Sequence, residues 1–73
     1  MENYPKYVKD SDWHFYKLLN ENDAIQVYSG YDDFRIQTYP VRIIENDLGC
    51  TESEFLAAYG EVKNKLEELC LAL

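Results

Sequence analysis

The sequence has few of the residues on which most catalytic and metal sites depend. Among its 73 residues there is a single histidine, His14, together with two cysteines, three glycines and two prolines. A metal site built from several imidazoles is therefore excluded. The sequence also contains no glycine-rich phosphate loop, no nucleophile elbow and no metalloprotease helix motif. We predict that the protein is not an enzyme and that it uses neither a metal nor a cofactor.

Basic residues are also scarce. Seven lysines and arginines stand against fourteen aspartates and glutamates, so the formal net charge at pH 7 is −7. Nucleic-acid backbones are bound by clustered basic residues, and anionic membrane surfaces repel acidic proteins. No stretch approaches the ~18 apolar residues of a transmembrane helix, and the first residues contain no apolar signal-peptide core. We expect a cytoplasmic, soluble protein that binds neither nucleic acid directly nor a membrane.

What the sequence does contain is a large share of apolar and aromatic residues. The apolar fraction is 47% and the aromatic fraction is 15%, which is far from the composition of a disordered chain. A chain of this length has room for one hydrophobic core. Because no repeat or low-complexity tract divides the sequence, residues 1–73 are predicted to form a single domain.

Residues ~4–44 have the pattern of antiparallel β-structure. Pro40 cannot donate to a strand ladder, so it is predicted to end the last strand or to kink it at an edge. Four runs rich in Tyr, Phe, Trp, Val and Ile alternate with breaks of Asp, Asn, Ser and Gly; these runs are residues 4–9, 13–19, 24–29 and 34–39. The pattern predicts a β-meander of three to four strands.

The last third of the sequence predicts one α-helix over residues ~51–72. Thr51 and Glu54 have the spacing of a capping box, in which each side chain accepts a hydrogen bond from the other residue's amide. Cys50 and Phe55 occupy the positions of a hydrophobic staple. An apolar stripe at helical spacing is expected to cover the sheet, with Leu66, a central member of the stripe, buried in the core. The stripe contains Phe55, Tyr59, Val62, Leu66, Leu69 and Leu73.

Together these patterns predict an α+β fold, in which the antiparallel meander is covered on one face by the C-terminal helix. A helix of ~20 residues spans ~30 Å. Cys50 and Cys70 are therefore too far apart for a disulfide, which needs Cα atoms within ~7 Å of each other. Two free thiols are typical of a protein in a reducing compartment.

The helix stripe also has the spacing of a coiled coil, although it is short for one. The sheet needs a cover, so packing within the chain is favoured. Leu56, Cys70 and Ala72 lie beside the stripe, which leaves dimerisation through the outer side of the helix open.

The loop lengths predict which side chains share a face of the sheet. A four-residue loop pairs Ser29 with Phe34 and places Val27 opposite Ile36 on an apolar face. The other face then carries polar and aromatic side chains, in the pairs Tyr28–Arg35 and Gln26–Gln37.

The register of the second strand is open between two alternatives. One register points Tyr16 and Leu18 inward, toward the apolar face. The other, which needs a bulge, points Trp13 and Phe15 inward. We favour the second, because Trp and Phe are usually buried and because Val8 is then expected to pair with Trp13.

The face opposite the helix is the candidate binding surface. Tyrosine and arginine are the residue types that most often anchor protein interfaces, and glutamine adds hydrogen-bonding capacity. Tyrosines also suit solvent-facing strands without any binding role. We predict a stacking platform for another protein or for a second copy of the chain, formed by Tyr28, Arg35, Tyr39, Gln26, Gln37 and Tyr16.

Two other functions compete with this one. Acidic residues of the predicted helix suit a nucleic-acid mimic that inhibits a DNA- or RNA-binding protein, although most acidic surfaces are simply solvated. A cysteine-dependent enzyme, with His14 as base and Cys50 as nucleophile, is the weakest alternative, because nothing in the sequence links the two. Calcium binding of the EF-hand type is excluded, since the position that requires glycine is Phe15.

Overall fold

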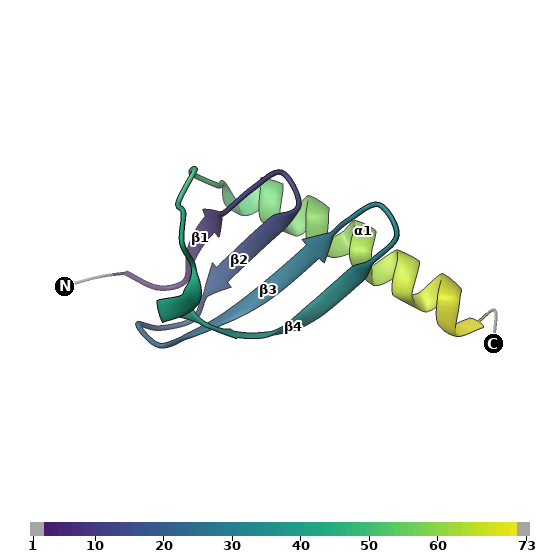
Figure 1. The fold of residues 1–73 in the computed structure, drawn as a ribbon, viewed down its shortest axis with the longest axis horizontal. Helices are drawn as coiled ribbons and strands as arrows, with labels where there is room; N and C mark the ends of the chain where they lie inside the picture. The colour runs from purple at the N-terminus through teal and green to yellow at the C-terminus, as the bar shows by residue number, and fades with distance from the viewer. Residues whose placement is uncertain (1–2, 72–73) are drawn as a thin grey trace.

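The computed structural model describes residues 3–71 as an antiparallel sheet with one helix packed on one side (Figure 1). The four strands pair in sequence order; they are β1 (Lys6–Lys9), β2 (His14–Leu18), β3 (Asp23–Ser29) and β4 (Phe34–Pro40). A short 3₁₀ helix, η1 (Val41–Ile43), follows β4, and the helix α1 spans Glu52–Leu71. The predicted α+β fold, with a meander and a C-terminal helix on one face, is confirmed.

Side chains alternate between the two faces of the sheet and form rows across the paired strands. Both outer-face pairs that the sequence predicts between β3 and β4 are confirmed. The outer face, which points away from α1, carries three such rows: the first row is His14, Tyr28 and Arg35; the second row is Val8, Tyr16, Gln26 and Gln37; the third row is Lys6, Leu18, Ala24 and Tyr39.

The inner face holds the apolar cluster beneath α1. Val27 of the sheet and Val62 of the helix are completely buried, and they pack together with Phe55 and Ala58. Phe15 lies opposite Val27 in the ladder, as the favoured register of the second strand requires. The inner cluster is therefore formed by the middle of the sheet and the first half of the helix.

The start of β2 differs from the prediction. The sequence predicts that Trp13 points inward and pairs with Val8, but Trp13 lies in the loop before β2 and is 51% exposed. Val8 pairs instead with Tyr16, on the outer face. The reason is the length of the connection: five residues, 10–14, lie between the paired residues Lys9 and Phe15, so Val8 pairs with Tyr16 and Trp13 falls in the turn.

Part of the outer face is covered by the chain that follows β4. The Val41 amide donates to the Asn22 carbonyl (3.0 Å), which directs residues 41–44 back across the sheet. The sequence predicts these residues as part of the meander, but they contain the 3₁₀ helix η1 instead of a strand. Val41 and Ile44 pack, together with Tyr4, against a buried outer cluster formed by Val8, Tyr16, Leu18 and Ala24.

Beyond Ile44 the chain follows the β1 edge to the start of α1 (Figure 1). The Leu48 amide donates to the Lys9 carbonyl at 2.8 Å, and the Asn46 side-chain amide donates to the Asp10 carboxylate at 2.8 Å. A cover therefore lies on both faces of the sheet, but the outer one is short and leaves the first row open.

The predicted capping box begins α1. The Glu54 amide donates to Thr51 Oγ1 and the Thr51 amide donates to the Glu54 carboxylate, both at 3.1 Å. Cys50 packs against the inner cluster that contains Phe55, as expected for a hydrophobic staple. Cys50 and Cys70 are both free: Cys50 lies two residues before α1, and Cys70 lies in the last turn of this continuous helix.

The second half of α1 projects beyond the sheet (Figure 1), and the molecule is 46 Å long but only 21 and 19 Å across. We call residues 63–71 the overhang. Leu66 is 37% exposed and Leu69 is 58% exposed, so the expectation that the whole stripe lies on the sheet is wrong. The helix is longer than the sheet is wide, and the sheet lies beneath α1 only as far as about Val62. Leu73 lies outside the described residues.

Candidate functional site

The first row of the outer face is a stack of three side chains from three neighbouring strands. The rings of His14 and Tyr28 are stacked, with their centroids 4.6 Å apart and their planes at 18°. The Arg35 guanidinium carbon lies 4.8 Å from the centroid of the Tyr28 ring, which is a cation–π contact. Because β2 and β4 flank β3, Tyr28 is held from both sides.

The two loops at this end of the sheet hold the outer members of the stack. Arg35 Nε lies 3.2 Å from the Asp33 carboxylate, and the Ser11 hydroxyl is hydrogen-bonded to His14 Nδ1 at 2.9 Å. A β-carbon at Gly30 would lie only 2.6 Å from the Tyr28 hydroxyl oxygen, so glycine leaves room for the ring. The stack is therefore positioned before any partner binds, which reduces the entropy lost on binding.

The second row forms a hydrogen-bonded layer next to the stack. The Gln37 side-chain amide donates to Gln26 Oε1, and the Gln26 amide donates to the Tyr16 hydroxyl at 3.1 Å. Tyr16 is 1% exposed, and burial raises the pKa of its hydroxyl. Within residues 3–71, no buried side-chain nitrogen or oxygen lacks a hydrogen-bond partner.

The six residues predicted for the platform therefore share one face of the sheet but differ in access. Tyr28 is half-buried, whereas Arg35 and Gln37 are exposed. Tyr39 is half-buried in the third row, where its ring centroid lies 5.2 Å from that of Tyr16. Tyr16 and Gln26 are buried, so they support the surface from below and are not available for contact. The cover formed by residues 41–44, which the sequence did not predict, explains the burial of Tyr16.

His14 belongs to the stack and was not among the predicted platform residues. The signal was present in the favoured register, because strand alternation places His14 on the same face as Tyr16. His14 cannot act with Cys50, since it lies on the outer face whereas Cys50 packs against the inner cluster. Burial raises the pKa of the Cys50 thiol, and the nearby Glu54 carboxylate raises it further by a smaller amount. A raised pKa favours the unreactive protonated form of the thiol.

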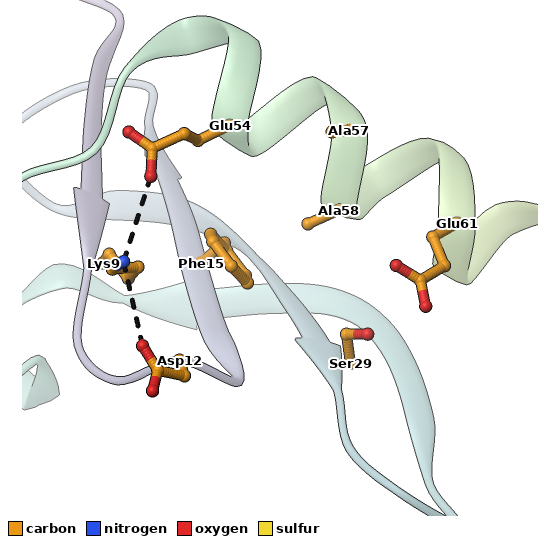
Figure 2. A pocket seen from close by; sticks show the side chains of 8 residues that line it. All are labelled: Lys9, Asp12, Phe15, Ser29, Glu54, Ala57, Ala58 and Glu61. Carbon is orange, nitrogen blue, oxygen red and sulfur yellow. Dashed lines mark ion pairs between the residues drawn. The ribbon is translucent and has the colours of Figure 1, made fainter.

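An acidic pocket of about 320 Å³ lies on the inner side, between the start of α1 and the β1–β2 loop (Figure 2). Lys9 Nζ lies 3.9 Å from both the Asp12 and the Glu54 carboxylates. Hydrogen bonds from Thr51 lower the pKa of Glu54. Glu61 and Ser29 line the other end of the pocket, so its charge is net negative. Across residues 3–71, no three histidine, cysteine, aspartate or glutamate side chains are placed to hold a metal ion.

Comparison with known proteins adds no family to this description. No protein-family model, no curated protein and no solved structure matches the chain. In the part of the chain that the structure describes, no helix has the length and apolar character needed to cross a membrane. The site has therefore to be interpreted from its own geometry.

Proposed function

We propose that the protein is a small, non-enzymatic module that binds another protein through the end of the sheet that carries the first row. The observation that carries the proposal is the stack of His14, Tyr28 and Arg35, which is held in place and lies beyond the cover of the outer face. Two free thiols support a reducing, cytoplasmic location.

The loops beside the first row add aromatic side chains. Trp13, in the 10–13 loop, is exposed, and its carbonyl accepts from the Ser29 amide at 2.9 Å. Tyr31, in the 30–33 loop, is also exposed. Both loops lie at the same end of the antiparallel sheet. We call Trp13, His14, Tyr28, Tyr31 and Arg35 the aromatic end.

The composition of the aromatic end is that of a binding hot spot. Tryptophan, tyrosine and arginine are enriched among the residues whose truncation costs most binding energy. These side chains bury large apolar areas while their polar atoms keep hydrogen-bonding capacity. Arg35, which is paired with Asp33, also gives this end a guanidinium that can stack on an aromatic side chain or hydrogen-bond to a carboxylate of the partner.

A matched pair of charge reversals tests the proposal. Arg35 and Arg42 are both exposed arginines, but only Arg35 contacts Tyr28. Proteins captured from a cell lysate by the wild type should be lost with Arg35→Glu and retained with Arg42→Glu. With a purified partner, calorimetry should show at least a ~10-fold weaker affinity for Arg35→Glu and for Tyr28→Ala. Capture of the same proteins by all of the variants would overturn the proposal.

The salt dependence of binding separates this function from nucleic-acid mimicry. A mimic binds a basic groove through its acidic helix, so its affinity should fall steeply with salt and should not depend on Arg35. Binding through the aromatic end should persist at ~0.5 M salt, where charges more than a few ångströms apart are screened. A steep loss with salt, equal for the wild type and Arg35→Glu, would favour the mimic.

A further inference from the structure

An apolar groove lies beside α1, on the side away from the acidic pocket. Its volume is about 440 Å³, and its lining residues are Lys17, Ile25, Ile36, Phe55, Leu56 and Tyr59. Leu56 and Tyr59 are exposed on the helix, whereas Ile25 and Ile36 are half-buried on the sheet. Lys17 is the one charged side chain in this lining. A contiguous apolar surface of this kind on a soluble protein commonly marks an interaction site.

The overhang continues the same apolar surface along the helix. At ~100° per residue, Leu66 and Cys70 lie on the side of α1 that carries Leu56 and Tyr59. Leu66 and Leu69 extend the stripe that packs on the sheet, but both are exposed, because the second half of α1 projects beyond the sheet (Figure 1). The overhang propagates from the packed half of α1, so it is the exposed leucine side chains of its stripe that would gain free energy from a packing partner.

We propose that a second copy of the chain fills the groove, and that the two overhangs dock reciprocally around a twofold axis. Each chain carries both an empty groove and an unseated apolar segment, which is the requirement for a closed, isologous dimer. In the dimer the two helices lie side by side and antiparallel, and each overhang rests on the inner face of the other sheet.

The spacing of the exposed residues is self-complementary. Leu56 and Leu69 are equally far from the midpoint between residues 62 and 63, and so are Tyr59 and Leu66. A twofold axis beside this midpoint therefore brings the second copy's Leu69 next to Leu56 and its Leu66 next to Tyr59. Leu66 and Leu69 belong to the stripe that faces a sheet, so in the dimer they point down toward Ile25 and Ile36 of the other chain.

Charge supports the same arrangement. The last turn of α1 contains no basic residue, and Glu67 and Glu68 precede its end. A helix C-terminus carries a partial negative charge and is stabilised by a nearby cation. The antiparallel arrangement brings this end of the second copy to Lys17, the charged residue of the groove.

The exposed area is also larger than a monomer of this size requires. The accessible surface is 5287 Å² for a chain of 8.6 kDa. Monomeric proteins of that mass expose ~4,700 Å², so the excess is ~600 Å². A standard interface buries ~800 Å² on each partner. This excess is about three-quarters of the area that a standard interface buries on each partner.

Sedimentation equilibrium of the full chain tests the proposal. We expect a mass of twice 8.6 kDa, with dissociation on dilution, and Leu69→Glu should weaken the dimer at least ~10-fold. Leu71→Glu is the matched control, because Leu71 is in the same helical turn, is 88% exposed and points away from the stripe. Circular dichroism should show an unchanged fold for both variants, since neither side chain is buried. A mass of 8.6 kDa at ~1 mM protein, or equal weakening by both variants, would overturn the proposal.

Cross-linking tests the antiparallel arrangement. In a Leu56→Cys/Cys50→Ala variant, the thiol introduced at position 56 should lie near Cys70 of the second copy. Mild oxidation should then give a covalent dimer. The Cys50→Ala variant alone has no thiol opposite Cys70 and is the control. A dimer by mass that gives no cross-link in the double variant would overturn the reciprocal arrangement.

Discussion

The two faces of the sheet are covered in different ways, and each cover leaves one part open. The inner cluster contains apolar side chains and lies under the regular stripe of α1. The outer cluster is covered by residues 41–44 and Tyr4, and it includes Tyr16, whose hydroxyl accepts a hydrogen bond from Gln26. A long helix overshoots the sheet, whereas a short connection covers only part of it. The overhang and the open aromatic end both result from this mismatch of lengths.

The difference also determines how each side is stabilised. Beneath α1 the stabilisation comes from burial of apolar area, at ~25 cal/mol per Å². On the outer side, buried polar groups have to find partners, and the chain from Gln37 to Tyr16 provides them. We expect substitutions on the inner side to act through lost packing, and those on the outer side to act partly through hydrogen bonding and ionisation.

The largest expected effect distinguishes the two halves of the helix. Phe55 is buried, so Phe55→Ala should lower the free energy of unfolding by ~3–5 kcal/mol. Leu66→Ala should cost no more than ~1 kcal/mol, because Leu66 lies on the overhang. Urea unfolding at protein concentrations that favour the monomer measures both. Equal losses would mean that the overhang is part of the monomer core.

A smaller effect tests the outer cluster. Tyr16→Phe removes the hydroxyl that accepts from Gln26 and should cost ~1–2 kcal/mol. The substitution should also change the response to alkali. Burial raises the pKa of Tyr16 above its ordinary value of 10.0, so the unfolded chain loses this proton first. The free energy of unfolding should therefore fall as the pH rises above 10.0, and less steeply in Tyr16→Phe. Identical slopes for the two proteins would contradict this burial.

The smallest effect concerns the start of α1. Thr51→Ala removes the hydroxyl that accepts from the Glu54 amide and should cost ~1 kcal/mol. Thr51→Ser keeps this hydroxyl, so the free energy of unfolding should fall much less than in Thr51→Ala. Thermal unfolding followed by circular dichroism compares the two variants, and an equal loss for both would show that the cap contributes nothing.

The sequence by itself determined the features that depend on neighbouring residues. The capping box of Thr51 and Glu54 acts within one helical turn, and a four-residue loop sets the pairing of Ser29 with Phe34. The alternation of β3 and β4 then separates the apolar and polar faces without further information. The fold class follows from these local patterns, because the apolar face of β3 and β4 needs an amphipathic cover and the C-terminal helix is the long amphipathic segment of the sequence.

Only the tertiary structure decided how far each cover reaches. The burial of Tyr16 depends on Tyr4 and Ile44, which are distant from it in the sequence. Leu66 has the helical spacing of a core residue. It is exposed nevertheless, because it belongs to the part of α1 that projects beyond the edge of the sheet. Periodicity describes which side of a helix is apolar, not what lies opposite that side. The extent of a core is set by contacts between distant segments, and no local pattern in this sequence encodes them.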